Sequence, residues 1–85
     1  MSEFHFAEDA FKDYIYWQAQ DKKTLKKINS LLKDISRNPF KGMGKPEPLK
    51  GGDWSRRINE KDRLVYAISD DVIYIKQCKG HYGDK

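Results

Sequence analysis

The stretch "WSRRINEKDRLVYAISDDVIYIKQCK", Trp54–Lys79, decides the expected fold. It contains three runs rich in β-branched and aromatic residues, "WSRRIN", "DRLVYAIS" and "VIYIKQCK", and such runs are typical of strands. Asp70 and Asp71 stand between the last two runs and predict a tight turn. We therefore expect the second half of the chain to form a sheet.

Residue parity within the second run predicts which face of this sheet is buried. Successive side chains of a strand point to opposite faces. Leu64, Tyr66 and Ile68 share one face, and they are bulkier than Val65 and Ala67 on the other. We therefore expect the bulkier face to pack against helices from the first half of the chain.

The same alternation places arginines on the open face of the predicted sheet. Arg63 opens the second run and points away from the core. Arg57 lies opposite Ile58, which parity assigns to the core, so two guanidinium groups are expected to meet on the open face. Parity puts Arg56 on the core side beside Trp54, where we expect an edge position to let its charged end reach water.

A short strand at "EFHF" and a first helix are expected at the beginning of the chain. The run "AEDAFKDYIYWQAQ" has apolar residues at helical spacing, and its early acidic residues suit a first helical turn. The apolar positions of this helix are Phe11, Tyr14, Ile15 and Trp17.

A second, amphipathic helix is expected to start at an Asp21 cap and to end before Pro39. Its apolar residues recur at intervals of three and four: Leu25, Ile28, Leu32 and Ile35. Its lysines fall elsewhere: Lys22, Lys23, Lys26, Lys27 and Lys33. They form either a grip for an RNA backbone or the solvated face of a surface helix. Residues 38–53, with three prolines and four glycines, predict a shaped loop.

The composition is that of a small domain with a modest excess of positive charge. The 85 residues, of which 38% are apolar and 35% charged, suffice for one modest core, so we assign residues 1–85 to a single domain. A balance of 17 Lys and Arg against 13 Asp and Glu gives a net charge of +4, which suits a polyanionic partner. No apolar run could span a bilayer and the N-terminus lacks a signal-peptide pattern, so we expect no membrane partner and a cytoplasmic location.

Cysteine and histidine are scarce. The single cysteine, Cys78, cannot form an internal disulfide, and we interpret it as a small buried side chain near a strand end. With only His5 and His81 beside it, zinc ligands are few, so we expect neither a metal nor another cofactor. His5 is expected on the surface of the first strand, and no sequence feature activates Cys78 as a nucleophile paired with His81.

A glutamate among cations, Glu47 in "GKPEPLKGGDWSRR", points to chemistry. A carboxylate weakens a site that only binds anions, but it suits metal-free cleavage of RNA. That reaction needs a base for the 2′-hydroxyl, cations for the phosphate and an acid for the leaving 5′-oxygen. The residues that supply this set are Glu47, Lys50, Arg57, Arg63 and His81. Taken alone, however, the residues favour a basic, non-catalytic RNA-binding module, in which Glu47 is dispensable, over a nuclease, because structural ion pairs also account for such a set.

Several phrases resemble the Txe/YoeB branch of the RelE/ParE superfamily of bacterial type II toxins. They are "DYIYWQAQDKKTLKKINSLLKDI", "NPFKGMGKPEPLK", "WSRRI", "RLVY" and the late "HY", and they span nearly the whole chain in order. The resemblance implies an α+β fold, with a twisted antiparallel β-sheet packed against two N-terminal helices. It also implies a ribosome-dependent endoribonuclease, or mRNA interferase, that cuts mRNA in the ribosomal A site and is held inactive by a YefM-like antitoxin.

The resemblance assigns roles to single residues. The glutamate of "KPEPLK", a general base in the family, falls on Glu47, and the phosphate-binding lysine that closes the phrase falls on Lys50. The second arginine of "WSRRI" falls on Arg57 and the arginine of "RLVY" on Arg63, both expected to stabilise charge in the transition state.

The final "HY" pair falls on His81, expected to be the general acid, and on Tyr82, expected to shape the site or stack near the base. The expected catalytic residues are thus Glu47, Arg63 and His81, and the expected substrate- and phosphate-binding residues are Lys50, Arg57 and Tyr82. A gyrase-poisoning toxin of the ParE kind would share the fold without this set and is the alternative within the superfamily. The sequence leaves open whether the chain forms a homodimer.

Overall fold

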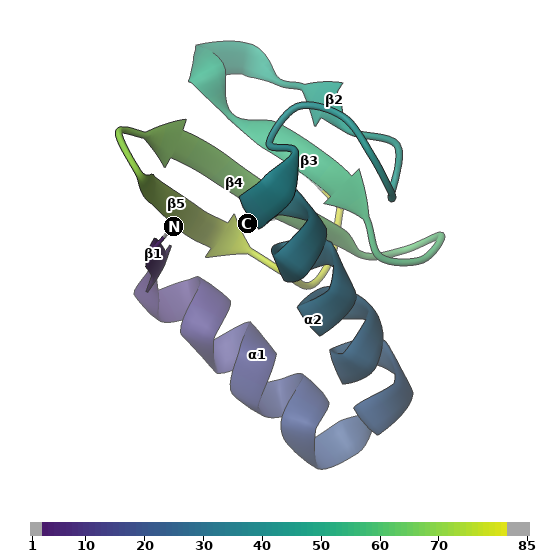
Figure 1. Cartoon of the computed structure of the whole chain (residues 1–85). Coiled ribbons are helices and arrows are strands. Elements are labelled where there is room, and N and C mark those ends of the chain that lie inside the picture. Colours follow the sequence, from purple (N-terminus) through teal and green to yellow (C-terminus); the bar gives the residue numbers. More distant parts are fainter. Residues whose placement is uncertain (1–2, 82–85) are drawn as a thin grey trace.

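One mixed sheet carries the strands of the described chain. The computed structural model describes residues 3–81, and within them five strands pair in the order β1-β5-β4-β3-β2 (Figure 1). The strands are β1 (Glu3–Phe6), β2 (Glu47–Pro48), β3 (Trp54–Arg57), β4 (Arg63–Ser69) and β5 (Val72–Gln77). The strands expected at "EFHF" and in the second half of the chain are thus confirmed.

The sheet departs from the expected antiparallel pattern at one pair. The pairs from β2 to β5 are antiparallel, but β1 runs parallel to β5, with Phe4 opposite Ile73. Antiparallel neighbours are commonly joined by a tight turn, whereas parallel neighbours need a crossover connection. Both helices and three strands separate β1 from β5 in the sequence, so no hairpin dictates their relative direction.

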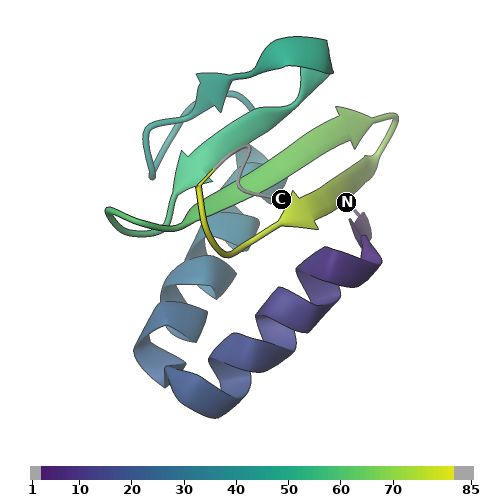
Figure 2. The same cartoon turned by 180° about the vertical axis from the view of Figure 1, so that it is seen from behind.

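Two helices cover one face of the sheet. They are α1 (Glu8–Gln20) and α2 (Lys22–Arg37), and Figure 2 shows that the opposite face carries no helix. The predicted cap is confirmed, because Asp21 accepts hydrogen bonds from the backbone nitrogens of Lys23 and Thr24 at 3.1 and 3.2 Å. Within residues 3–81 neither helix is long and apolar enough to cross a membrane.

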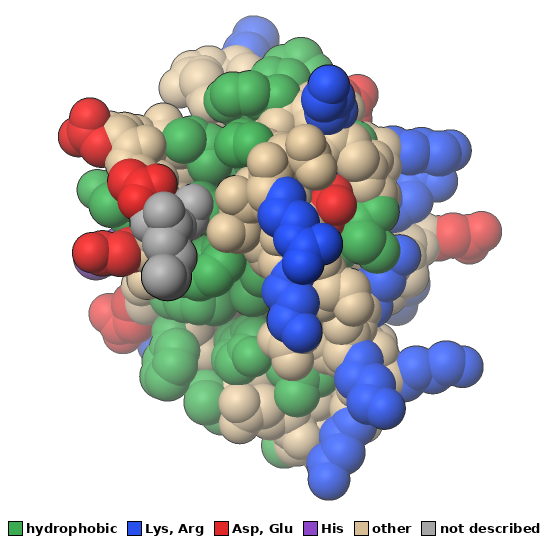
Figure 3. Space-filling view, viewed as in Figure 1, with side chains coloured by type: hydrophobic (Ala, Val, Ile, Leu, Met, Phe, Trp, Pro, Cys, Tyr) green, Lys and Arg blue, Asp and Glu red, His purple; other side chains and the backbone are tan. Residues whose placement is uncertain are grey.

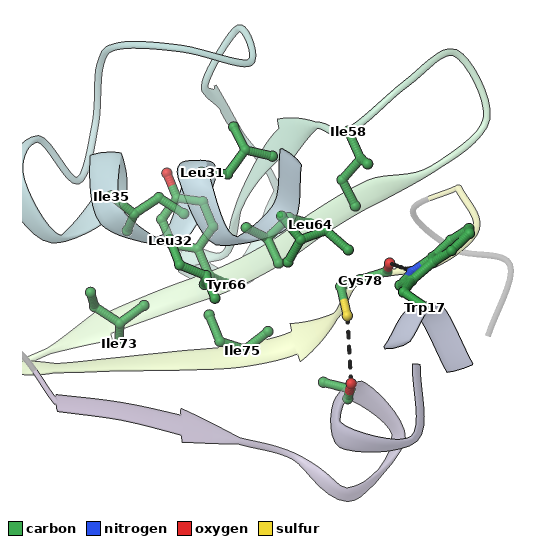
Figure 4. Packing of buried hydrophobic residues seen from close by; sticks show 12 residues of the cluster. Trp17, Leu31, Leu32, Ile35, Ile58, Leu64, Tyr66, Ile73, Ile75 and Cys78 are labelled. Carbon is green, nitrogen blue, oxygen red and sulfur yellow. Dashed lines mark hydrogen bonds between the residues drawn. The ribbon is translucent and has the colours of Figure 1, made fainter. Parts of the chain in front are cut away.

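The core lies between the two helices and the inner face of the sheet (Figure 4). Leu64, Tyr66 and Ile58 are buried there and Ile68 packs against them, so the parity prediction is confirmed. On α2 the buried residues are Ile28, Leu31, Leu32 and Ile35. The lysines of α2 lie away from this face, and Figure 3 shows Lys and Arg side chains along the helix.

The inner face of α1 agrees only in part with the one predicted, because Trp17 is buried and Tyr14 packs against the core as expected, but Phe11 and Ile15 do not. Phe11 and Ile15 are 54% and 45% exposed, whereas Asp13 and Trp17 are buried. The reason is a tertiary contact, because this side of α1 faces the chain that follows β5. Asp13 Oδ2 accepts a hydrogen bond from Cys78 N at 3.1 Å, and Trp17 Nε1 donates one to Cys78 O at 2.8 Å. Cys78 is fully buried after β5, as predicted.

Arg56 does not reach water, contrary to the prediction. Its side chain is fully buried between α2 and the sheet, where Nη1 bonds to Asp34 Oδ2 at 2.7 Å and Nε donates to Tyr66 Oη at 3.1 Å. Its guanidinium also donates to backbone carbonyls of the loop after α2, those of Asn38, Lys41 and Met43. Arg56 therefore fastens that loop beneath β3.

Candidate active site

Three predicted site residues, Glu47, Arg57 and Arg63, meet at one cavity. Its volume is about 330 Å³. The lining residues are Lys45, Pro46, Glu47, Ser55, Arg57 and Arg63. The cavity thus lies where β2, β3 and the start of β4 come together.

Strand register explains why these side chains share one side of the sheet. Glu47 pairs with Ser55 across β2 and β3, and Arg57 pairs with Arg63 across β3 and β4. Ser55 and Arg57 are two residues apart, so their side chains point the same way, opposite to the buried Arg56 between them. The predicted meeting of two arginines on the open face is therefore confirmed.

The loop that carries Glu47 is fixed by a close backbone approach. Arg57 N donates to Gly44 O at 2.6 Å, and Gly44 has a φ of +83°, a conformation that suits glycine. A Cβ at this position would lie 2.8 Å from Leu31 Cδ2 and 3.2 Å from Arg56 Cβ. Gly44 therefore lets the chain pass between α2 and β3 just before it reaches the cavity.

Arg63 is tied to the turn between β3 and β4. Its Nη1 donates to Asn59 O at 2.7 Å and to Asp62 O at 3.1 Å. Asn59 Nδ2 in turn donates to Asp62 Oδ2 at 3.0 Å, which closes the turn on itself. Arg63 is therefore half-buried and held in place, whereas Arg57 is exposed.

The other predicted residues lie around the cavity or beyond the described chain. Lys50 is exposed in a 3₁₀ turn, Lys50–Gly52, which joins β2 to β3, and it does not line the cavity. His81 does not line it either, but it directly follows Gly80, whose carbonyl accepts a hydrogen bond from Arg63 N at 3.0 Å. Tyr82 lies outside the described residues.

Two lining residues, Lys45 and Ser55, were not singled out in the sequence. Lys45 precedes Pro46 in the same phrase as Glu47, so its proximity to that glutamate was a usable signal. Ser55 has the parity of Arg57, which places it on the open face.

The charge of the cavity favours an anion. Lys45, Arg57 and Arg63 bring three positive charges against the single negative charge of Glu47. Arginine and lysine bind phosphate through charge-assisted hydrogen bonds. No cluster of three or more His, Cys, Asp or Glu side chains that could hold a metal ion occurs in residues 3–81.

A second hollow lies on the helical side of the molecule and holds none of the predicted site residues. Its volume is about 630 Å³, and it opens between β1, α1 and α2. Its lining residues are Phe4, Tyr14, Asn29, Leu32, Lys33, Ser36 and Arg37. The cavity around Glu47 is therefore the candidate active site.

Comparison with known proteins identifies the family. The model of the YoeB-like toxins of bacterial type II toxin-antitoxin systems matches residues 6–82. The chain belongs to this YoeB family. Toxin YoeB of Escherichia coli strain K12 is 55% identical over 80 residues, which cover 91% of this chain and 95% of that protein.

Solved YoeB structures share the fold closely. A YoeB dimer from Staphylococcus aureus is 52% identical with a TM-score of 0.90, and the match covers 95% of this chain and 98% of that one. A heterotetrameric complex of YoeB and YefM from the same organism contains a toxin that is 51% identical, with a TM-score of 0.88 over 96% of this chain and 99% of that one. The two-helix, mixed-sheet architecture described above is thus that of YoeB toxins.

Proposed function

We propose that this YoeB-family toxin is an endoribonuclease that cuts mRNA in the ribosomal A site and so inhibits translation. The observation that carries the proposal is the cavity in which Glu47 stands among Lys45, Arg57 and Arg63. A carboxylate placed inside a phosphate-binding cluster is what metal-free cleavage of RNA requires, because the base must lie next to the phosphate that is attacked.

The proposed reaction is a transfer within the RNA. Glu47 takes the proton of the 2′-hydroxyl, whose oxygen attacks the adjacent phosphorus. Arg57 and Arg63 stabilise the negative charge that grows on the phosphate oxygens. The bond from phosphorus to the 5′-oxygen breaks, and His81 gives that oxygen a proton. The products are a 2′,3′-cyclic phosphate and a 5′-hydroxyl.

Lys50 and Tyr82 act at the margin of this reaction. Lys50, which is exposed in the turn after β2, binds a phosphate of the RNA outside the cavity. Tyr82 follows His81 in the sequence and stacks on a nucleotide near the base.

The partners follow from the same proposal. The toxin acts on mRNA and ribosomes in the cytoplasm, and a YefM-like antitoxin holds it inactive. The complex of YoeB with YefM from Staphylococcus aureus supports this partner, and the YoeB dimer from the same organism supports self-association of the present chain. A segment rich in Asp and Glu would suit the cationic cavity, because opposite charges steer and fix protein partners.

Primer extension tests the proposal. Ribosomes translating a reporter mRNA are incubated with the wild-type toxin, with Glu47→Gln, or without toxin, and the 5′ ends of the fragments are mapped. Discrete cuts in frame with translation are expected for the wild type alone. Binding to RNA without cuts would leave a non-catalytic module, and gyrase-dependent breaks in DNA would favour the ParE kind of toxin.

A further inference from the structure

The chain that follows β5 is fastened to the start of β4. Gly80 N donates to Asp62 Oδ1 at 2.8 Å, and Gly80 O accepts from Arg63 N at 3.0 Å. In Figure 2 this segment, drawn in yellow, runs from the end of β5 towards the end of β3. The backbone of His81 therefore lies beside the arginine that lines the cavity.

One buried side chain, that of Gln77, binds the backbone carbonyls of this segment. Gln77 is only 7% exposed, and its Nε2 donates to the carbonyl oxygens of Lys79 at 3.0 Å, Gly80 at 3.0 Å and His81 at 2.8 Å. Carbonyls only accept hydrogen bonds, so the amino end of the amide must face them. Gly80, with a φ of +84°, supplies the bend that turns three successive carbonyls towards one nitrogen.

A β-bulge in the sheet turns the side chain of Gln77 towards these carbonyls. Val65 pairs with Gln77 while the next residue of β4, Tyr66, pairs with Ile75, so β5 has one extra residue, Lys76. Such a bulge reverses the alternation of side chains. Ile75 points into the core, and Gln77 instead shares the open face with Val65.

Gln77 belongs to the same row of residues as the proposed base. Register pairs join Glu47 to Ser55, Ser55 to Val65, and Val65 to Gln77, across β2, β3, β4 and β5. Neighbouring strands are about 4.8 Å apart, so three spacings separate the two ends of the row by about 14 Å. Gln77 is therefore too far from Glu47 to touch the reacting phosphate itself.

We propose that Gln77 is a positioning residue for the general acid. It holds the backbone of Lys79, Gly80 and His81 so that the imidazole of His81 reaches the leaving 5′-oxygen. This inference rests on the proposed ribonuclease reaction. Without the amide, three carbonyls lose a buried donor and the segment moves away from Arg63, which misplaces the acid but leaves Glu47 where it was.

Backbone dynamics test whether Gln77 holds the segment. Nitrogen-15 relaxation is measured for the wild type and for two variants, Gln77→Leu and Gln77→Asn. Gln77→Asn keeps an amide on a shorter side chain, and it provides the test if Gln77→Leu does not fold. Order parameters of residues 79–81 should fall from about 0.85 towards 0.6 in the variants. Ile73→Val, a core change on the same strand, is the matched control and should leave them unchanged. Unchanged values in both Gln77 variants would overturn the proposal.

A change of leaving group tests whether the segment serves the acid. The substrate is an mRNA whose scissile 5′-oxygen is replaced by sulfur, because a thiolate leaves without a proton. In single turnovers on saturating ribosomes, the Gln77 variants should cut ordinary mRNA about 10- to 100-fold more slowly. They should cut the sulfur substrate at nearly the wild-type rate. Equal slowing on both substrates would overturn the proposal.

Two reference variants separate this inference from the proposed function. His81→Ala should show the same selective loss on ordinary mRNA, and Glu47→Gln should be slow on both substrates. If His81→Ala is not rescued by sulfur, the assignment of the acid is wrong and the proposed function fails at that step. The relaxation data then still decide whether Gln77 holds the segment.

Discussion

Arg57 and Arg63 lie directly opposite each other in neighbouring antiparallel strands. Like charges in that arrangement destabilise a sheet. Arg63 has hydrogen bonds to the turn between β3 and β4. The side chain of Arg57 has no hydrogen bond or ion pair with the part of the chain that the structure describes. A pair of like charges that faces a cavity suits the anionic substrate proposed above.

The two arginines should therefore differ in their effect on stability. Arg57→Ala removes a repulsion, so the free energy of unfolding should stay within about 0.5 kcal/mol of the wild type or rise. Arg63→Ala also removes bonds to backbone carbonyls and should lower that free energy by about 1 kcal/mol. Both should slow mRNA cleavage. Urea denaturation and single-turnover kinetics measure the two effects, and equal losses of stability would contradict this account.

Loss of either proton-transfer group should slow the chemical step. Glu47→Gln and His81→Ala should each reduce the single-turnover rate about 10²- to 10⁴-fold, the usual range for general acid-base catalysis, with little change in ribosome binding. An mRNA with 2′-deoxyribose at the scissile position should not be cut, and mass spectrometry of the fragments should show a 2′,3′-cyclic phosphate. Near-normal cleavage of the deoxy substrate would refute the mechanism.

The lysines of α2 should hold the toxin on ribosomal RNA. Five lysines are to be replaced by glutamate together: Lys22, Lys23, Lys26, Lys27 and Lys33. Because phosphate contacts release counterions, the wild type should bind ribosomes more tightly at low salt, and this salt dependence should shrink in the variant. Co-sedimentation with ribosomes measures both. Lys12→Glu on α1 is the control, and identical co-sedimentation of the five-fold variant would assign the lysines to the solvated face.

Acid should weaken the anchor between Asp34 and Arg56. The hydrogen bond from the Arg56 guanidinium, helped by one from Met43 N, holds the pKa of Asp34 below its ordinary value. The folded state therefore binds this proton less readily than the unfolded state. The resulting stability is present above the ordinary carboxyl pKa and is lost as the pH falls through the lowered one. Urea midpoints measured from pH 6 down to pH 3 should drop less steeply for Asp34→Asn than for the wild type.

The close approach at Gly44 should make this position intolerant of a side chain. Gly44→Ala combines a positive φ with a Cβ 2.8 Å from Leu31 Cδ2, so it should destabilise the fold by more than about 1 kcal/mol and displace Glu47. Gly51→Ala, with a φ of +78° and no atom within 4 Å of the added Cβ, is the matched control for backbone strain alone. Equal thermal stability of the two variants would show that the approach tolerates a methyl group.

Short-range patterns were sufficient to predict much of the molecule. The cap at Asp21, the two helices, β1 and the strands from β3 to β5 were predicted correctly because spacing and turn residues act locally. The short strand β2 and the 3₁₀ turn Lys50–Gly52 were missed, because they lie in the segment that was predicted to be a loop. Parity correctly assigned Leu64 and Tyr66 to the core and brought Arg57 to Arg63, since alternation is fixed by the strand itself.

The predictions failed where the burial of a side chain depends on partners that are far away in the sequence. Arg56 is buried because Asp34, 22 positions away, and the loop carbonyls after α2 satisfy its donors. Asp13 is buried because Cys78 N, 65 positions away, donates to it. The bulge that aims Gln77 away from the core likewise depends on pairing with β4. No local pattern encodes these partners.

The parallel pairing of β1 with β5 has a consequence for synthesis. β5 follows every other described element in the sequence, yet it is an inner strand that joins β1 to β4. A nascent chain that stops before Val72 therefore leaves β1 without its neighbour and α1 without its contacts to Cys78. We expect such a chain to remain unfolded by circular dichroism, so that the fold forms only once the residues from Val72 to Cys78 have been synthesised.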